Sequence, residues 1–130
     1  IDILPRQNNQ QYVLYRQVDL ALDPFPCCGG TTSCDSLWMG TPFVSLAGRT
    51  FVSRMGVTLL HSVGLDELIA DNEAQYIATA VALANGLPRL RALRKGLRER
   101  VAASPLMNAP RFALHFGQAL QAMWAQREER

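Results

Sequence analysis

Residues 18 to 40 combine an apolar run, a glycine turn and the start of a helix. The run VDLAL (18–22) has the composition of a buried strand, and Gly29 and Gly30 precede a helical segment that opens at Thr31. Because glycine lacks a Cβ, the backbone can bend closely around a ligand there. Free N–H groups and the positive end of the helix dipole attract anions. The segment therefore predicts a site for the diphosphate of a nucleotide.

The helix that opens at Thr31 is expected to have a ligand-binding face and an apolar core face. A helical wheel places Thr31, Thr32, Asp35 and Met39 on the ligand-binding face. It places Cys34, Leu37 and Trp38 on the core face. Asp35 follows the threonines by one turn, about 5 Å along the axis, which suits a carboxylate that accepts hydrogen bonds from ribose hydroxyls. Alternatively, Thr31 caps the helix and Asp35 only complements its dipole. Spacing alone leaves both interpretations open.

The secondary-structure pattern is α/β at first and then entirely helical. Alternating strands and helices favour a parallel sheet, here a partial Rossmann-like one. We expect strands at 1–4, 18–22, 42–46 and 67–70, and helices at 8–17, 31–39, 51–63, 73–84, 87–102 and 108–126. No internal repeat or linker is apparent, so we expect one domain over residues 1–130.

Composition and charge favour a soluble protein that does not bind nucleic acid. Of the 130 residues 48% are hydrophobic and 18% charged, and the net charge of +2 forms no basic stripe, so residues 89–100 are expected to be a solvated helix face. The cysteines are expected to be reduced thiols without zinc-site spacing to either histidine. No apolar run approaches the roughly 20 residues of a membrane helix, and no secretory signal is apparent, so we expect a cytoplasmic protein.

Several motifs resemble the C-terminal part of one enzyme family. They are GGTTSCDSLWMGTPFVSLAGRTFVSR (29–54), YIATAVALAN (76–85), LRALRKGLRERVAASPLMN (90–108) and AMW (122–124). This set resembles the O-linked N-acetylglucosamine transferases and their SPINDLY-like relatives, glycosyltransferase family 41. The resemblance implies the C-terminal half of a GT-B domain followed by helices. It also implies an inverting enzyme that transfers sugar from a nucleotide donor to Ser or Thr hydroxyls of proteins.

The resemblance assigns roles to residues of the glycine turn. In the family the paired threonines hold the donor diphosphate and the acid one turn later binds the ribose, while a residue before VDLAL lies in a loop that holds the base. The predicted donor-binding residues are Gly29, Gly30, Thr31, Thr32, Asp35 and Gln11. No residue of this chain is predicted to be catalytic or to bind a metal, because the family's base lies upstream and an Asp-x-Asp pair is missing.

The chain also departs from the family pattern. Bacterial relatives usually have Tyr-Asn in place of Cys27-Cys28, animal enzymes have His in place of Gly30, and many relatives have His in place of Gln11. An amide at position 11 can form hydrogen bonds but carries no charge. Two further candidates for phosphate contact, Arg49 and Arg54, flank the loop after the strand at 42–46, although surface arginines are commoner there.

The expected function is the donor-binding part of a longer glycosyltransferase, with helical (TPR) repeats upstream and no activity on its own. The resemblance implies UDP-N-acetylglucosamine as the donor. Two alternatives stay open: a part of a SPINDLY-like enzyme that uses GDP-fucose, and a degenerate interaction module without catalysis. A Rossmann-type oxidoreductase is disfavoured because G-x-G-x-x-G is missing. We expect a homodimer of this chain, formed through the sheet edge at 1–4 or through the closing helix with Phe112, Phe116, Leu120 and Trp124.

Overall fold

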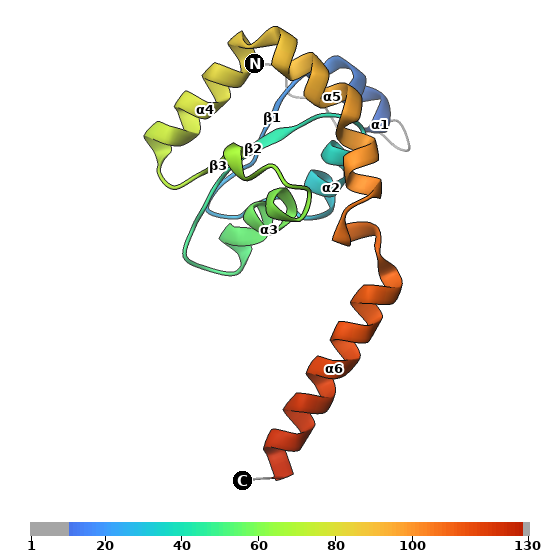
Figure 1. The fold of residues 1–130 in the computed structure, drawn as a ribbon. Coiled ribbons are helices and arrows are strands. Elements are labelled where there is room, and N and C mark those ends of the chain that lie inside the picture. Colours follow the sequence, from blue (N-terminus) through green and yellow to red (C-terminus); the bar gives the residue numbers. More distant parts are fainter. Residues whose placement is uncertain (1–10, 129–130) are drawn as a thin grey trace.

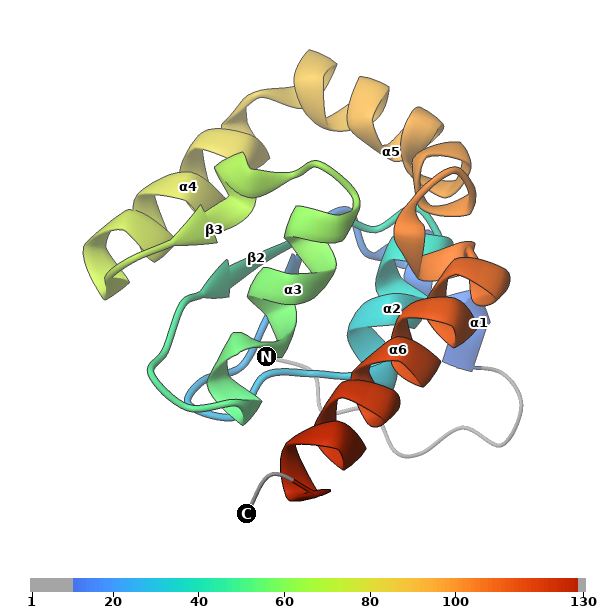
Figure 2. The ribbon, with the colours of Figure 1, turned by 60° about the horizontal axis from the view of Figure 1, so that its bottom comes forward.

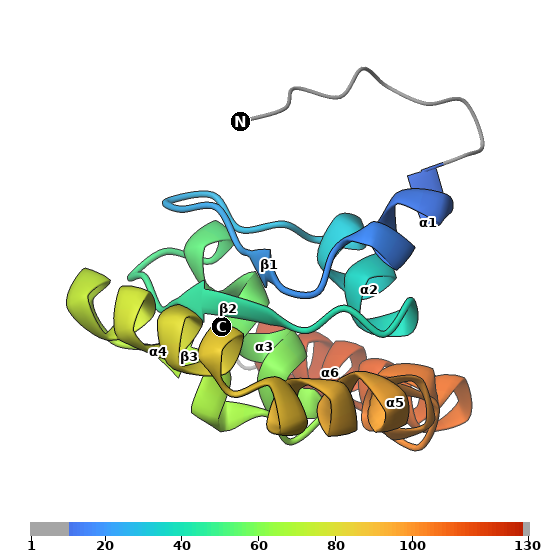
Figure 3. The same cartoon turned by 90° about the horizontal axis from the view of Figure 1, so that it is seen from above.

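The computed structural model describes residues 11–128, in which three short parallel strands form the centre of the fold. The strands lie in the order β1-β2-β3, so β2 is central and β1 lies at the edge (Figure 3). Their bounds are Ala21–Leu22 for β1, Phe43–Leu46 for β2 and Ile69–Ala70 for β3. Ala21 of β1 pairs with Phe43, and Ser45 of β2 pairs with Ile69. The predicted α/β class with a parallel sheet is confirmed.

Helical crossovers connect the parallel strands, as parallel pairing requires. The crossover from β1 to β2 contains α2 (Thr31–Trp38), and that from β2 to β3 contains the 3-10 turn η2 (Val52–Arg54) and α3 (Met55–Ser62). Two glycines with positive φ lie just after these helices, Gly40 at 79° and Gly64 at 66°. Figure 2 shows α2 and α3 beside each other next to the sheet.

The two faces of β2 are covered by different helices. Phe43 packs in a large core cluster that includes Leu37 of α2 and Leu60 of α3, all three at most 1% exposed. Val44 points to the opposite face and packs with Tyr76 of the next helix. Because side chains alternate along a strand, a strand covered on both sides is apolar at successive positions. The chain thus encloses its central strand with its own helices.

The second half of the chain is helical, as predicted. It contains η3 (Asp66–Leu68), α4 (Glu73–Asn85), α5 (Leu87–Ala102), η4 (Pro105–Met107) and α6 (Ala109–Glu128). Asn72 caps α4, because its side-chain oxygen accepts the amide of Gln75 at 2.9 Å. Helix α5 packs against α2 and contributes Leu90 and Leu97 to the core. Figure 1 shows α6 extending away from this α/β body.

The structure corrects several predicted boundaries. Within the described residues the predicted helix at 8–17 is α1 (Gln11–Leu14) followed by η1 (Tyr15–Gln17), and residues 8–10 lie outside them. The segments 51–63 and 67–70 each begin with a 3-10 turn. The strand at 18–22 is reduced to β1, because only its last two residues pair with β2. The predicted strand at 1–4 lies outside the described residues. These differences shorten elements without changing their order.

Candidate functional site

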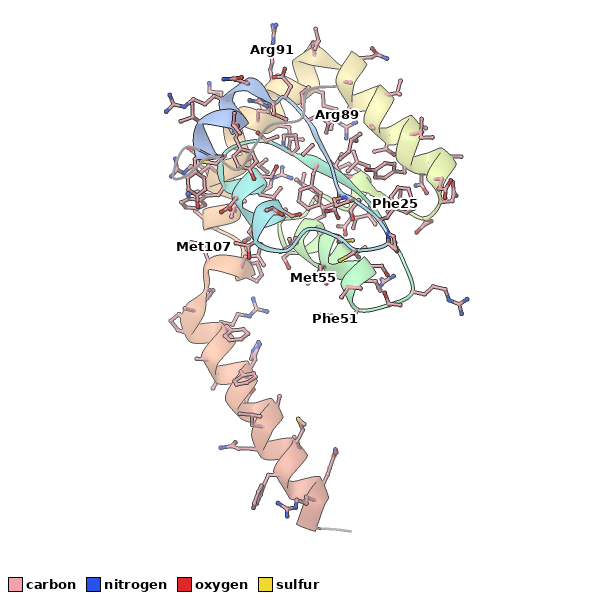
Figure 4. All side chains as sticks on the ribbon, turned by 180° about the vertical axis from the view of Figure 1, so that it is seen from behind. Phe25, Phe51, Met55, Arg89, Arg91 and Met107 are labelled. Carbon is pink, nitrogen blue, oxygen red and sulfur yellow. The ribbon has the colours of Figure 1, made fainter. Side chains whose placement is uncertain are left out.

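The glycine turn lies between the carboxyl end of β1 and the first turn of α2. Ligands of open parallel α/β sheets bind at this edge. The turn is tied down at both ends, because the amide of Cys28 donates to the carbonyl of Val52 at 3.1 Å and that of Gly29 donates to Asp23 Oδ1 at 2.9 Å. Met55 of α3, labelled in Figure 4, lies against Gly30: a Cβ built on Gly30 would be 3.1 Å from its Cε.

Three successive amides at the start of α2 have no acceptor in the described part of the chain. They belong to Gly30, Thr31 and Thr32, whereas the amides of Ser33 and Cys34 both donate to the carbonyl of Gly30 at 3.1 Å. Thr31 and Thr32 are exposed. The start of α2 therefore offers three N–H groups, two nearby hydroxyls and the positive end of the helix dipole, a combination that suits an anion.

The alternative role proposed for Thr31, that of a helix cap, is wrong. The cap residue of α2 is Gly30, which has no side chain to accept a hydrogen bond, and Thr31 is the first helical residue. A helix start without a side-chain cap leaves its N–H groups to solvent or to a ligand. This geometry removes one explanation of the threonine pair that does not involve a ligand.

Asp35 lies one turn further along α2 and is half-buried. It borders a pocket of about 270 Å³ whose walls come from α2, α5 and η4. Trp38 forms part of this wall, and the guanidinium of Arg98 lies 4.6 Å from the centre of its ring. Met107, labelled in Figure 4, closes another side. Asp35 thus lies beside an apolar pocket and one turn from the start of α2, where its carboxylate can accept hydrogen bonds from ribose hydroxyls.

The predicted core face of α2 is partly wrong. Cys34 is exposed, while the buried residues are Ser33, Ser36 and Leu37. The serines can be buried because each hydroxyl has an acceptor: Ser33 Oγ donates to Asp23 Oδ1 at 3.3 Å, and Ser36 Oγ donates to the carbonyl of Thr41 at 2.7 Å. A prediction based on side-chain polarity therefore missed the two buried serines and wrongly placed Cys34 in the core.

Tyr15 joins the segment before β1 to the first turn of α2. Its hydroxyl donates to the carbonyl of Thr32 at 3.2 Å, and its own carbonyl accepts the hydroxyl of Thr41 at 3.2 Å. Burial raises the pKa of Tyr15, and the negative charge of Asp35 raises it further. Gln11, the predicted base-reading residue, begins α1 four residues earlier, but its side chain lies outside the described part.

The two arginine candidates lie elsewhere or bind the protein itself. Arg54 donates to the carbonyl of Gly48 at 3.2 Å. Arg49 is exposed and borders a separate pocket of about 460 Å³ beyond the carboxyl ends of β2 and β3, whose described lining includes Phe25 and Asp71 and none of the predicted donor residues. The contacts that the structure gives these two arginines are therefore not with the start of α2.

The sequence interpretation missed Asp23, the residue directly after β1. It is 3% exposed and accepts the amide of Gly29, so it belongs to the structure of the turn. The sequence does contain a sign of this role, because Asp23 directly follows the apolar run VDLAL. An acid that is buried at such a position needs hydrogen-bond donors around it. Among the described residues, no group of three or more potential metal ligands occurs, and none of the helices is long and apolar enough to cross a membrane.

Comparison with known proteins places this geometry in one family. The model of glycosyl transferase family 41 matches residues 9–116. A probable UDP-N-acetylglucosamine–peptide N-acetylglucosaminyltransferase SPINDLY of Arabidopsis thaliana is 41% identical over 95% of this chain, and its counterpart in Solanum lycopersicum is 38% identical over the same share. The UDP-N-acetylglucosamine–peptide N-acetylglucosaminyltransferase of Caenorhabditis elegans is 30% identical over 85%.

A solved structure agrees with these matches. A mutant O-GlcNAc transferase of Thermobaculum terrenum superposes with a TM-score of 0.83 and 33% identity, covering 92% of this chain and 23% of that one. The chain spans 14% of the length of the two plant relatives and 10% of that of the nematode relative.

Proposed function

Because the chain belongs to glycosyltransferase family 41, we propose that it forms the donor-binding part of an inverting protein O-glycosyltransferase that modifies Ser or Thr. UDP-N-acetylglucosamine is the proposed donor, since the names of the plant and nematode relatives contain it. In this proposal residues 1–130 are one domain of a longer cytoplasmic protein with upstream TPR repeats. Its acceptor site and catalytic base lie outside this chain, so the chain alone transfers no sugar.

The observation that carries the proposal is that the amides of Gly30, Thr31 and Thr32 have no acceptor among the residues that the structure describes. Sugar transfer by inversion requires that the leaving diphosphate be stabilised as its bond to the sugar breaks. Preorganised N–H groups, two hydroxyls and a helix dipole supply that stabilisation without a metal ion. Asp35 would hold the ribose from the next turn. The turn would thus bind the donor and stabilise the leaving group with the same atoms.

Two alternatives differ in what they predict for ligands. The first is a SPINDLY-like enzyme that uses GDP-fucose, and it is supported by the departure at the base-reading position, where this chain has Gln11 in place of His. The second, a degenerate interaction module, is favoured by Cys27-Cys28 within the turn and by Gln11. Titration of the intact protein with UDP and GDP separates the three. Tighter binding of GDP supports the first alternative, and binding of neither supports the second.

The role of Asp35 is tested by comparing two ligands on one variant. Asp35→Ala in the intact protein should weaken UDP binding about 10-fold or more, as expected for lost hydrogen bonds to a charged group, and should leave inorganic pyrophosphate within about 2-fold. Only UDP carries a ribose. The matched control is Glu73→Ala, which removes an exposed acid from the first turn of α4 and should affect neither ligand. Equal losses for UDP and pyrophosphate would refute the ribose contact.

We also propose that the isolated chain dimerises through α6. Its large apolar side chains are exposed, among them Phe112 at 67% and Phe116 at 54%, and these two rings stack at 5.7 Å. The helix contacts the rest of the described chain mainly through η4. A contiguous apolar face of this kind is seldom left in water, and a second copy offers the same face in return. The other predicted contact, the edge at 1–4, lies outside the described residues.

A further inference from the structure

The carboxylate of Asp23 joins three elements around the glycine turn. Oδ1 accepts the amide of Gly29 at 2.9 Å and the hydroxyl of Ser33 in α2 at 3.3 Å, while Oδ2 accepts the hydroxyl of Ser45 in β2 at 2.7 Å. The backbone carbonyl of Asp23 accepts the Tyr76 hydroxyl from α4 at 2.9 Å. Donors on both oxygens provide hydrogen bonds for the buried carboxylate and fix its orientation.

Two glycines leave this carboxylate no room to move. A Cβ built on Gly29 would lie 2.4 Å from Ser33 Oγ and 3.3 Å from Asp23 Oδ1, and a Cβ on Gly56 of α3 would lie 2.3 Å from Asp23 Oδ2. Real Cβ atoms do not approach other atoms as closely as the two shorter distances. The carboxylate is therefore packed between the turn and α3, and it holds the turn in one conformation.

The hydrogen bond to Gly29 also determines which amides of the turn are available. The N–H of Gly29 is committed to Asp23, and the following amides, those of Gly30, Thr31 and Thr32, have no acceptor in the described chain. A negative carboxylate placed behind a diphosphate site would repel the ligand, so its charge cannot explain its position. Its hydrogen bonds to the turn can.

We propose that Asp23 is a positioning residue, which holds Gly29 and Ser33 so that the three free amides are fixed for the donor diphosphate. This inference rests on the proposed function. Preorganised donors bind charge more tightly than mobile ones because no reorganisation is needed when the ligand arrives. Loosening the turn should therefore weaken diphosphate binding even when the fold is intact.

The test uses two serines that donate to the same carboxylate from opposite sides. Ser33→Ala in the intact protein removes the donor on the α2 side, next to the turn, and Ser45→Ala removes the shorter bond on the β2 side. Both hydroxyls are buried, so the two variants should lose similar stability in thermal unfolding. We expect Ser33→Ala to raise the Kd for UDP about 3- to 10-fold and to raise that for inorganic pyrophosphate equally, with less than a 2-fold change for Ser45→Ala.

Equal effects of the two serine variants on UDP binding would overturn the inference, because Asp23 would then support only the fold. An effect of Ser33→Ala on UDP but not on pyrophosphate would also overturn it, since the change would act away from the diphosphate. Failure of the proposed function looks different: the unaltered protein would bind neither UDP nor GDP, and the inference would fall with it.

Discussion

The glycine turn and helix α6 differ in how completely the chain satisfies their groups. Behind the turn, Asp23, Ser33 and Ser45 are buried and hydrogen-bonded to one another, and no buried side-chain nitrogen or oxygen of the described residues lacks a partner. Along α6 the large apolar side chains are exposed, including Met123 at 67% and Leu120 at 50%. At the turn and the start of α2, three backbone amides have no acceptor within residues 11–128, which suits a small anion. Helix α6 instead exposes an apolar face, which suits another protein surface.

This difference separates what the chain can do alone from what requires a partner. The turn is built by β1, β2, α2, α3 and α4 together, all of which belong to the α/β body. Helix α6 instead extends away from these elements, and among the described residues it contacts mainly η4 (Figure 1). We therefore expect the proposed nucleotide site to persist in the isolated chain and α6 to associate with a second copy.

The largest expected contrast is between two phenylalanines. Phe43→Ala should lower the free energy of unfolding by about 3–5 kcal/mol, because Phe43 is 1% exposed in the core. Phe116→Ala should change it by less than about 0.5 kcal/mol. Urea denaturation at a concentration that keeps the chain monomeric measures both. A loss for Phe116→Ala as large as that for Phe43→Ala would mean that α6 is part of the core.

The two neighbouring glycines of the turn should respond differently to the same change. Gly29→Ala places a Cβ 2.4 Å from Ser33 Oγ and 2.9 Å from Thr32 Oγ1, so we expect a loss of about 1–3 kcal/mol and weaker UDP binding. Gly30→Ala meets only the flexible end of Met55 at 3.1 Å and should cost less than about 1 kcal/mol. Denaturation and UDP titration of both variants test this, and a harmless Gly29→Ala would contradict the packed turn.

Association through α6 should depend on one side of the helix. Sedimentation over a wide concentration range should detect a dimer, and Phe116→Glu should weaken it about 10-fold or more. Gln118→Glu is the matched control, because residue 118 lies on the opposite side of the helix and should leave association unchanged. A chain that stays monomeric at high concentration, or a dimer equally sensitive to both changes, would rule out this interface.

The smallest expected effect is on the pH dependence of stability. Burial raises the pKa of Tyr76 above its ordinary 10.0, and the negative charge of Asp23 adds to this. A raised pKa in the folded state means that its contribution is present below about pH 10 and is lost as the pH rises through the folded value. Tyr76→Phe should lower stability by about 1 kcal/mol at neutral pH, and the stability of this variant should decline less than that of the unaltered protein as the pH rises above about 10.

Urea denaturation across this pH range is the measurement. Tyr15 and Cys28 have pKa values raised by burial in the same direction, so the decline should shrink without vanishing. An unchanged decline in Tyr76→Phe would contradict a pKa of Tyr76 that is raised by burial in the folded state.

The parts of the fold that follow from local patterns were predictable from the sequence. Glycine before threonine marked the start of α2, and the apolar run at 42–46 marked the central strand, which the structure confirms with small shifts. The register of Asp35 one turn beyond Thr31 and Thr32 follows from helix geometry alone. These features depend on neighbours in sequence.

The parts that depend on distant partners were not predictable. Ser33 and Ser36 are buried because Asp23 and the Thr41 carbonyl accept their hydroxyls, and Asp23 is buried because Ser45 lies opposite it in β2. A hydropathy pattern counts all of these as surface residues. Hydrogen bonds between polar groups far apart in the sequence therefore determine which face of α2 is buried and where the carboxylate of Asp23 lies.

The claim that the free amides of α2 receive a diphosphate is tested most directly by an amide-resolved NMR titration of the chain with UDP. We predict saturable shifts that are largest at Gly30, Thr31 and Thr32 and smaller at Gly29, whose N–H stays bonded to Asp23. Inorganic pyrophosphate should shift the same resonances. Saturable binding that leaves these three amides unchanged, for example with shifts centred on Arg49 and Asp71, would contradict the account.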